Sequence, residues 1–498
     1  MQKPSIIVQD LVVKMQEKSV LDGISFSLQP NQHIAIVGNA ESGKTTLAKA
    51  IAGKIHFSGK VVTDFSNITG MPTRINFVEQ RYSFKNLSGI SEFYYQQRYN
   101  SFDSTDAPSI FEELSKDSKP TNNINSVLAI LEIDHLKNAP LIQLSSGEHK
   151  RFQLAKSLIN APQLLILDNP YTGLDVSARK ELNKILKEIS DKGTQIILIP
   201  GTFSIPDFIT HVAFLENKKL NFFGGKEKFK KTISPAIIAD ANHNQIIFNT
   251  DPLPFSNENF QFETVVEMKN IQIKYGEHTI LQNLDWKVKQ GEKWLLKGRN
   301  GAGKSSLLSM ITGDHPQVYS NEIYLFGKRR GSGESIWDIK QKTGYISPEL
   351  HAYFDKNVSC FNAIGSGYFD TIGLFKKLSN NQYNNILQWL DFLQLSHGSN
   401  KPLHSISASL QRMILLARAL VKNPPLLVLD EPCQGLDRQQ SEQFVSLIDH
   451  VCSNSNKTLI YVTHDVSNIP TCVEKVLLLE KEGQKIYSAK PETELAVA

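Results

Sequence analysis

The chain has 498 residues, which is long for one domain and predicts two or three compact domains. Apolar residues make up 40% and charged residues 21%, as in ordinary globular proteins, and a formal net charge of +4 does not require a nucleic acid or an anionic membrane as partner. The apolar runs fall short of the roughly 18 residues of a membrane span, and the N-terminus lacks the pattern of a secretory signal. The four cysteines have no CxxC spacing, which argues against a disulfide framework or a zinc site and favours a reducing cytosol.

Two phosphate-loop motifs mark an internal repeat. The pattern GxxxxGK[ST] fits residues 38–45 and again residues 298–305, an offset of 298 − 38 = 260. LLILD, ending at Asp168, recurs as LLVLD, ending at Asp430, an offset of 430 − 168 = 262. The repeat predicts one domain over residues 1–225 and a second over 263–498.

Residues 226–262 have no counterpart and are predicted to be a linker. Prolines and asparagines within it argue against a continuous element. The basic cluster over residues 226–231 is interpreted as a solvated charge run, so nucleic acid is not an expected partner.

Each loop motif follows an apolar strand, HIAIVG or KWLLKG, and precedes a helical run. In this context glycines let the backbone fold round phosphates, while amide groups and the helix N-terminus supply positive potential. Lys44 and Lys304 are predicted to reach the β- and γ-phosphates of a nucleotide. The predicted ATP-binding residues of the two loops are Gly38, Gly43, Lys44, Thr45 and Thr46, and Gly298, Asn300, Gly301, Gly303, Lys304, Ser305 and Ser306.

Two aspartates end apolar strands of the kind found in parallel sheets. An α/β fold presents ligands at the carboxyl ends of such strands, where Asp168 and Asp430 can hold Mg²⁺. Thr45 and Ser305 are predicted to complete the two magnesium sites.

A third motif lies between the loop and the aspartate strand. Residues 144–148, LSSGE, resemble the LSGGQ signature of ABC ATPases, and the GLD segments at 173–175 and 435–437 resemble the D-loop of that family. The resemblance covers nearly all of both copies. It implies an α/β fold with two P-loop NTPase domains in tandem, each with a mainly parallel sheet, an antiparallel subdomain and a helical subdomain.

The resemblance also implies how ATP is bound. Two such domains pair head to tail, and each ATP lies between the Walker motifs of one domain and the signature of the other. Ser145 and Gly147 are the signature residues implied to contact ATP, and Gln80 occupies the Q-loop position of the first copy.

A narrower resemblance comes from residues 312–340 and the later SGYFDTIGLF. These runs are similar to stand-alone tandem ABC proteins of the ModF, or photorepair-protein, type. That type is associated with molybdate transport loci, although no residue here indicates an oxyanion site.

The two copies differ at three positions with family roles. Tyr275, implied to stack on adenine, has Met15 at the same spacing in the first copy. Glu431, implied to polarise the attacking water, has Asn169 as its counterpart, and an amide cannot accept a proton.

The third position is His464, implied to contact the γ-phosphate. Alignment of TLIYVTHDVSNIP with TQIILIPGTFSIP places it opposite Pro200. Lys304, Glu431 and His464 are therefore the predicted catalytic residues.

The signature and Q-loop differ as well. Ser407-Ala408-Ser409 of the second copy align with Ser145-Ser146-Gly147, so a Cβ stands where backbone should approach phosphate. Pro348 takes the place of the Q-loop glutamine in the second copy, which puts coupling to a transporter in doubt.

The head-to-tail rule places all four losses (Met15, Asn169, Pro200 and Ser409) in one composite site. We expect a monomeric cytoplasmic ATPase using ATP and Mg²⁺, with one active and one degenerate site. The alternatives are an ATPase subunit for separate permeases, peripheral at the inner membrane face, and a ribosome-associated factor, which the short linker disfavours.

Overall fold

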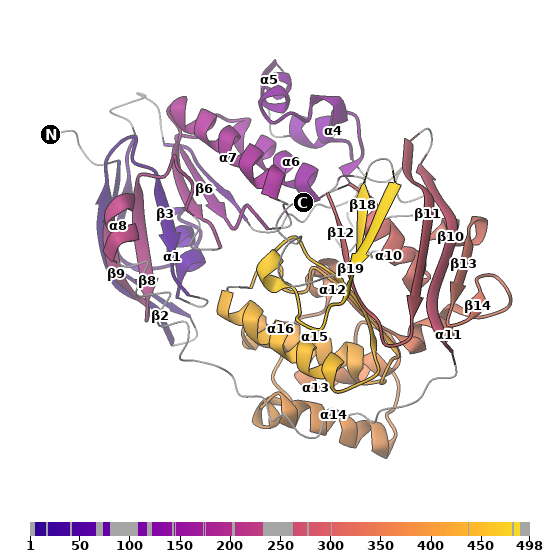
Figure 1. The fold of residues 1–498 in the computed structure, drawn as a ribbon. Coiled ribbons are helices and arrows are strands. Elements are labelled where there is room, and N and C mark those ends of the chain that lie inside the picture. Colours follow the sequence, from indigo (N-terminus) through magenta and orange to yellow (C-terminus); the bar gives the residue numbers. More distant parts are fainter. Residues whose placement is uncertain are drawn as a thin grey trace. The chain divides into compact units, whose positions relative to one another are not determined.

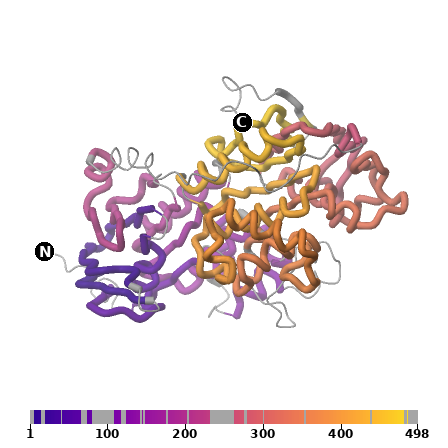
Figure 2. The backbone as a smooth tube through the Cα atoms, turned by 90° about the horizontal axis from the view of Figure 1, so that it is seen from below, coloured from indigo at the N-terminus to yellow at the C-terminus, as the bar shows by residue number. Residues whose placement is uncertain are grey.

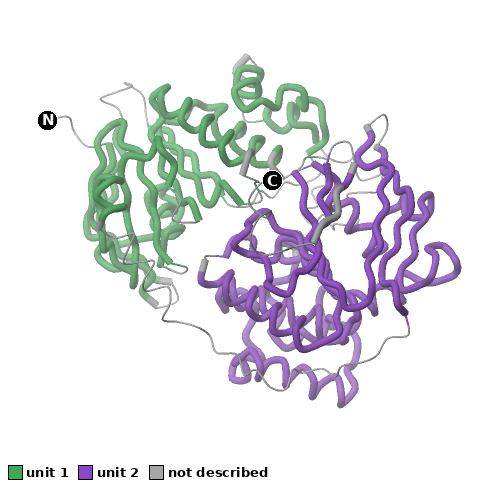
Figure 3. Tube along the Cα trace, in the orientation of Figure 1, with its two compact units in different colours: residues 1–93, 100–244 green, residues 94–99, 245–498 purple. Residues whose placement is uncertain are grey.

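The computed structural model describes residues 5–15, 18–39, 42–65, 73–79, 108–116, 122–141, 144, 146–172, 174, 176–201, 205–232, 262–275, 278–299, 301–436, 438–480 and 483–488. These residues form two compact units, one within residues 1–244 and the other within residues 245–498 (Figure 3). The motifs of the first copy lie in the first unit, and those of the second copy lie in the second.

The first unit is built on a six-stranded sheet with the order β5-β6-β7-β3-β8-β9. Neighbouring strands are parallel except β8 and β9, which form an antiparallel hairpin. The strands are β3 (Ile34–Val37), β5 (Ile75–Val78), β6 (Leu164–Asp168), β7 (Gln195–Ile199), β8 (His211–Glu216) and β9 (Lys219–Gly225). Every residue of β3, β6 and β7 is buried, which explains their continuous apolar sequences.

A second, antiparallel sheet of the first unit has the order β2-β1-β4. Its strands are β1 (Ile6–Met15), β2 (Lys18–Leu28) and β4 (Ser58–Thr63). The helices of this unit are α1 (Lys44–Ile51), α4 (Ile110–Ser115), α5 (Asn122–Ile130), α6 (Ser146–Leu158), α7 (Val176–Asp191) and α8 (Lys226–Thr232). In Figure 1, α4 and α5 lie beyond α6, on the side away from the antiparallel sheet.

The second unit repeats this plan, with the sheet order β15-β16-β17-β12-β18-β19. Only the pair β18 and β19 is antiparallel in that sheet. The strands are β12 (Lys293–Gly298), β15 (Thr343–Ile346), β16 (Leu426–Asp430), β17 (Thr458–Val462), β18 (Lys475–Glu480) and β19 (Gly483–Ser488).

The antiparallel sheet of the second unit has four strands in the order β11-β10-β13-β14. They are β10 (Thr264–Tyr275), β11 (His278–Lys289), β13 (Glu322–Leu325) and β14 (Lys328–Arg329). The helices are α10 (Lys304–Thr312), α11 (Ile336–Lys342), α12 (Pro348–Tyr353), α13 (Cys360–Gly365), α14 (Asn380–Phe392), α15 (Ala408–Leu420) and α16 (Arg438–Ser453). Figures 1 and 2 show α13 and α14 apart from the antiparallel sheet, so this unit has separate antiparallel and helical parts. The predicted α/β fold is confirmed in both units.

Part of the predicted linker is structured. Residues 226–232 form α8, whose Phe229 is 1% exposed and packs against Phe214 and Phe222. Lys226 is also buried, and its Nζ donates to the carbonyl of Pro206 at 2.8 Å. The basic run therefore contains one buried aromatic residue, Phe229, and the lysines around it make the segment look like a solvated charge run in the sequence.

Among the helices of the described ranges, none is long and apolar enough to span a bilayer.

Candidate nucleotide-binding sites

The two phosphate loops connect a buried strand to the N-terminus of a helix, β3 to α1 and β12 to α10. Gly43 and Gly303 are the residues just before the helices, with φ of 92° and 88°. A Cβ at Gly43 would lie 2.5 Å from Cδ2 of Leu21, and one at Gly303 would lie 2.9 Å from Cγ of Leu281. The left-handed backbone favours glycine at both positions, and a Cβ there would also displace a leucine side chain.

The side chain of each loop lysine folds back over its own phosphate loop. Nζ of Lys44 donates to the carbonyls of Gly38 at 2.8 Å and Asn39 at 2.5 Å. Nζ of Lys304 makes the same pair of bonds, to Gly298 at 2.7 Å and Arg299 at 3.0 Å. Each lysine ammonium group thus lies beside the loop amides that can donate to phosphate, so both kinds of donor are at one place.

A hydroxyl and a carboxylate meet beside the first loop. Oγ1 of Thr45 donates to Oδ2 of Asp168 at 2.9 Å. Asp168 is 6% exposed, its Oδ1 has no hydrogen-bond partner among the described residues, and burial raises the pKa of this carboxyl. A buried carboxylate with an unused oxygen and a neighbouring hydroxyl fits a hard divalent cation such as Mg²⁺. Ser305 and Asp430 hold the equivalent positions in the second unit, and Asp430 is also buried.

The residue after each of these aspartates has a left-handed backbone. Glu431 has φ of 45°, and its counterpart Asn169 has φ of 47°. The backbone amides of these residues bond equivalent carbonyls of the neighbouring strands: Glu431 donates to Val462 at 3.0 Å and Asn169 donates to Ile199 at 2.9 Å. Asparagine tolerates this conformation, whereas for glutamate it costs roughly 1–2 kcal/mol. The second unit therefore bears a conformational cost that the first unit avoids.

The sheet registers correct one predicted correspondence. Asp168 pairs with Ile199 and Asp430 pairs with Val462, so Ile199 and Val462 are equivalent. The residue two places further is Gly201 in the first unit and His464 in the second. The prediction that Pro200 stands opposite His464 was wrong by one residue, because an ungapped sequence alignment cannot detect a one-residue shift between the copies. The first unit still lacks an imidazole at this position.

The glutamate and the histidine of the second unit face each other. Nε2 of His464 lies 3.5 Å from Oε1 of Glu431, and their side chains are 17% and 19% exposed. In the first unit a Cβ built on Gly201 would lie 2.6 Å from Oδ1 of Asn169. The first unit thus has Asn169 and Gly201 in place of the Glu431–His464 pair. The asparagine amide cannot accept a proton from water, and glycine has no imidazole to donate a hydrogen bond.

The Q-loop difference agrees with the sheet register. Val78 pairs with Leu167 and Ile346 pairs with Leu429, so Pro348 stands where the first copy has Gln80. Gln80 itself lies outside the described residues. Pro348 is the first residue of α12, which Ser347 caps by accepting a hydrogen bond from the amide of Leu350. The position therefore begins a helix that suits proline.

The signature segments open α6 and α15. Oγ of Ser407 accepts a hydrogen bond from the amide of Leu410 at 3.3 Å and caps α15. Ser409 is 5% exposed, and its Oγ has no hydrogen-bond partner within the described part of the chain. Gly147 lies in the first turn of α6, whereas Ser145 and the loop residue Asn300 lie outside the described residues.

Comparison with known proteins agrees with these features. Residues 21–172 and 281–434 each match the ABC transporter family. The chain belongs to this family. It is 33% identical over 483 residues to the ABC transporter ATP-binding protein ModF of Escherichia coli, covering 94% of this chain and 96% of that one. An uncharacterized ABC transporter ATP-binding protein of Schizosaccharomyces pombe is 32% identical over 462 residues, covering 91% and 93%.

Solved structures show the same fold. An RNase-L inhibitor has a TM-score of 0.52 at 17% identity, covering 94% of this chain and 87% of that one. An archaeal ribosome recycling factor, in complex with a ribosomal stalk protein, has a TM-score of 0.54 with the same identity and coverage. The tandem ABC fold and the ModF resemblance are confirmed, and the two domains are ATP-binding domains of a family whose members hydrolyse ATP.

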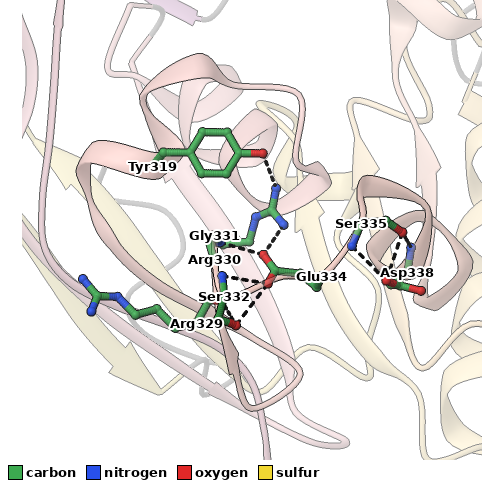
Figure 4. A network of polar contacts seen from close by, with 8 residues as sticks. All are labelled: Tyr319, Arg329, Arg330, Gly331, Ser332, Glu334, Ser335 and Asp338. Atoms are coloured by element: carbon green, nitrogen blue, oxygen red, sulfur yellow. Dashed lines mark hydrogen bonds and ion pairs between the residues drawn. The ribbon is translucent and has the colours of Figure 1, made fainter.

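The ModF-like run of residues 312–340 contains the 3-10 helix over residues 316–320, the strands β13 and β14, and the start of α11. Arg330 and Glu334 form a buried ion pair, with side chains 1% and 7% exposed and Nη1 2.6 Å from Oε1 (Figure 4). The guanidinium of Arg330 also lies over the ring of Tyr319, and the Glu334 carboxylate accepts from the amides of Gly331 and Ser332. The turn after β14 is thus held by a buried ion pair and by backbone hydrogen bonds to Glu334.

One position with a bearing on function, Gly201, was missed from the sequence. The only signal for it is the strand register, which places it beside Asn169. Tyr275 is the last residue of β10, and Met15 ends β1, so the two positions that the family resemblance assigns to adenine contact both lie at the end of the first strand of their unit.

Proposed function

We propose that the chain hydrolyses ATP at one composite site, made by the Walker motifs of the second domain and the signature of the first. The observation that supports this most strongly is the contact between Glu431 and His464, which Asn169 and Gly201 replace in the first domain. A proton acceptor beside the γ-phosphate position is thus available in one domain only.

The residues of the second domain have distinct roles in this proposal. Lys304 would neutralise charge on the β- and γ-phosphates, and Ser305 and Asp430 would hold Mg²⁺, which would supply further positive charge near the transferred phosphoryl group. Glu431 orients water for in-line attack and accepts its proton, while His464 contacts the γ-phosphate. Ser145 and Gly147 of the first domain complete the site.

The first domain retains the groups that bind nucleotide. Lys44 lies over its loop, and Thr45 with Asp168 forms the pair described above. Without Glu431 and His464 equivalents, and with Ser409 in the facing signature, this site is expected to hold ATP without turnover.

Replacement of Glu431 by Gln tests the assignment. We expect the steady-state rate of phosphate release to fall about 10²–10⁴-fold, because a general base is lost. ATP binding should persist, since the amide keeps the size of the side chain. Glu442→Gln, which removes an exposed carboxylate on α16 of the same domain, is the matched control and should keep the wild-type rate. A Glu431→Gln protein with turnover close to wild type would show that the catalytic site is assigned wrongly.

The work coupled to ATP turnover is a separate proposal. The Escherichia coli relative is named an ABC transporter ATP-binding protein, which favours a role beside a membrane transport system, and we propose an association of that kind for this chain, at the inner face of the membrane. Pro348 removes the Q-loop glutamine by which the family contacts its membrane subunit, so any such contact must use other residues. Affinity purification of ATP-loaded Glu431→Gln protein decides this point: a co-purifying permease supports the proposal, whereas ribosomes in its place would refute it.

A further inference from the structure

We infer that Gln317 and Asn321 position the adenine-stacking residue Tyr275, and so set the affinity of the active site for ATP. We call these two side chains the amide clamp. The inference rests on the proposed function in one respect, the role of Tyr275 in contacting the base. Gln317 lies in the 3-10 helix η4 (Pro316–Ser320), and Asn321 is the next residue after it.

The clamp replaces a missing strand. β13 pairs with β10 only from Val266 to Lys269, and β10 continues for six residues beyond that pairing, to Tyr275. The chain that enters β13 comes from η4, whose backbone is helical and cannot extend the ladder. The edge of β10 that leads to Tyr275 therefore needs other hydrogen-bond partners.

Two side-chain amides supply them. The amide of Gln272 donates to Oδ1 of Asn321 at 2.7 Å, and Nδ2 of Asn321 donates back to the carbonyl of Gln272 at 3.0 Å. The amide of Lys274 donates to Oε1 of Gln317 at 3.2 Å, and Nε2 of Gln317 donates back to the carbonyl of Lys274 at 2.6 Å. A primary amide has one acceptor and donors in the same arrangement as a peptide group, so each side chain acts as one residue of a strand.

The clamp is itself held in place. Nδ2 of Asn321 also donates to the carbonyl of Gln317 at 2.9 Å, and the amide of Gln317 donates to Nδ1 of the buried His315 at 3.1 Å. On its other edge the end of β10 pairs with β11, where Tyr275 stands opposite His278. The backbone that carries Tyr275 is thus bonded on both sides.

Within the described residues of the first domain, the equivalent strand has no matching pair of side-chain amides. An offset of 275 − 15 = 260 makes Val12 the counterpart of Gln272, and Val12 pairs with Ser58 of β4 by main chain. The residue in the place of Tyr275 is Met15. The domain with the aromatic residue is therefore the one with the clamp.

A fixed backbone lowers the entropy cost of placing the tyrosine against adenine. The four clamp bonds are exposed, so water can replace them when an amide is removed, and the fold should survive. We therefore expect Gln317→Ala to weaken ATP binding about 3- to 10-fold, within the range that base stacking contributes, and to change kcat less than twofold.

The test measures equilibrium binding in a Lys44→Ala background, so that the signal comes from the second Walker set. Gln317→Ala should weaken ATP but leave inorganic tripolyphosphate, which has no base, unchanged. Gln317→Glu keeps the acceptor and loses the donor, and it should fall between wild type and Gln317→Ala. Gln388→Ala removes an exposed glutamine from α14 of the same domain and is the matched control.

A double-mutant cycle then decides whether the clamp acts through Tyr275. In a Tyr275→Ala background, Gln317→Ala should have no further effect on ATP affinity. Equal weakening of ATP and tripolyphosphate, or a full effect of Gln317→Ala without Tyr275, would overturn the inference. Because the cycle measures binding, it gives its answer even if Glu431→Gln shows that hydrolysis has been assigned to the wrong site.

Discussion

Replacement of His315 by Asn should remove a pH-dependent component of the stability of the second domain. His315 is 1% exposed, caps η4, and accepts a hydrogen bond on Nδ1 from the amide of Gln317. Burial lowers its pKa from 6.5 to about 4. A pKa below the unfolded value means that the unfolded chain binds the proton more readily. The contribution of His315 to stability is therefore complete above pH 6.5 and is lost as the pH falls toward 4.

The magnitude follows from the two pKa values. The pKa differs by 6.5 − 4 = 2.5 between the unfolded and the folded chain, so the free energy of unfolding falls by about 3 kcal/mol once the histidine is protonated in both states. At pH 5 the native histidine is still mostly neutral whereas the unfolded one is charged, which gives a loss of about 2 kcal/mol.

The assay is urea unfolding of wild-type and His315→Asn protein at about pH 7.5, 6 and 5, followed by circular dichroism. Asparagine keeps an acceptor at the cap and carries no titratable group. We expect the wild-type free energy of unfolding to fall by about 2 kcal/mol more than that of the variant between pH 7.5 and pH 5. Parallel pH dependence in the two proteins would refute the argument that a buried neutral histidine caps η4.

Two further predictions concern packing that the sequence pattern obscures. Phe229→Ala should destabilise the first domain by about 3–5 kcal/mol, measured by thermal unfolding, because the ring is buried against two phenylalanines. Lys228→Ala, which removes an exposed side chain of α8, is the control. If Phe229→Ala had an effect as small as this control, α8 would not be part of the core. Glu334→Gln should cost the second domain about 3 kcal/mol, since it leaves the buried Arg330 guanidinium without its carboxylate. The double variant Arg330→Met with Glu334→Leu should recover most of that loss in denaturant unfolding, and no recovery would contradict an electrostatic cause.

Local patterns were sufficient to predict the strand–loop–helix segments and the residues proposed to bind nucleotide. A phosphate loop is a contiguous segment, so its glycines, lysine and hydroxyl can be identified directly; in the structure Lys44 bonds the loop carbonyls and Thr45 bonds Asp168. The strand ending at Asp168 was equally clear, because a strand buried on both faces is continuously apolar. Comparison of the two copies also identified Glu431 and Asn169 as counterparts, since they directly follow a motif.

Contacts between distant residues could not be predicted in this way. The counterpart of His464 depends on the pairing of β6 with β7 and of β16 with β17, and one residue of shift was enough to exchange Gly201 for Pro200. The helix over residues 226–232 packs through Phe229 against Phe214 of β8 and Phe222 of β9, and these contacts cannot be predicted from the basic sequence of the helix.

The tandem ABC domains, the strand–loop–helix phosphate loops and the chemical asymmetry between Glu431 and Asn169 could all be predicted from the sequence. These features depend on residue type within short segments, where local backbone preference and motif spacing are sufficient. Which groups face each other became known from the three-dimensional fold, because those distances follow from sheet register and packing. The amides of Gln317 and Asn321 lie 43 and 49 residues from the backbone that they bond, and no local pattern records such a contact.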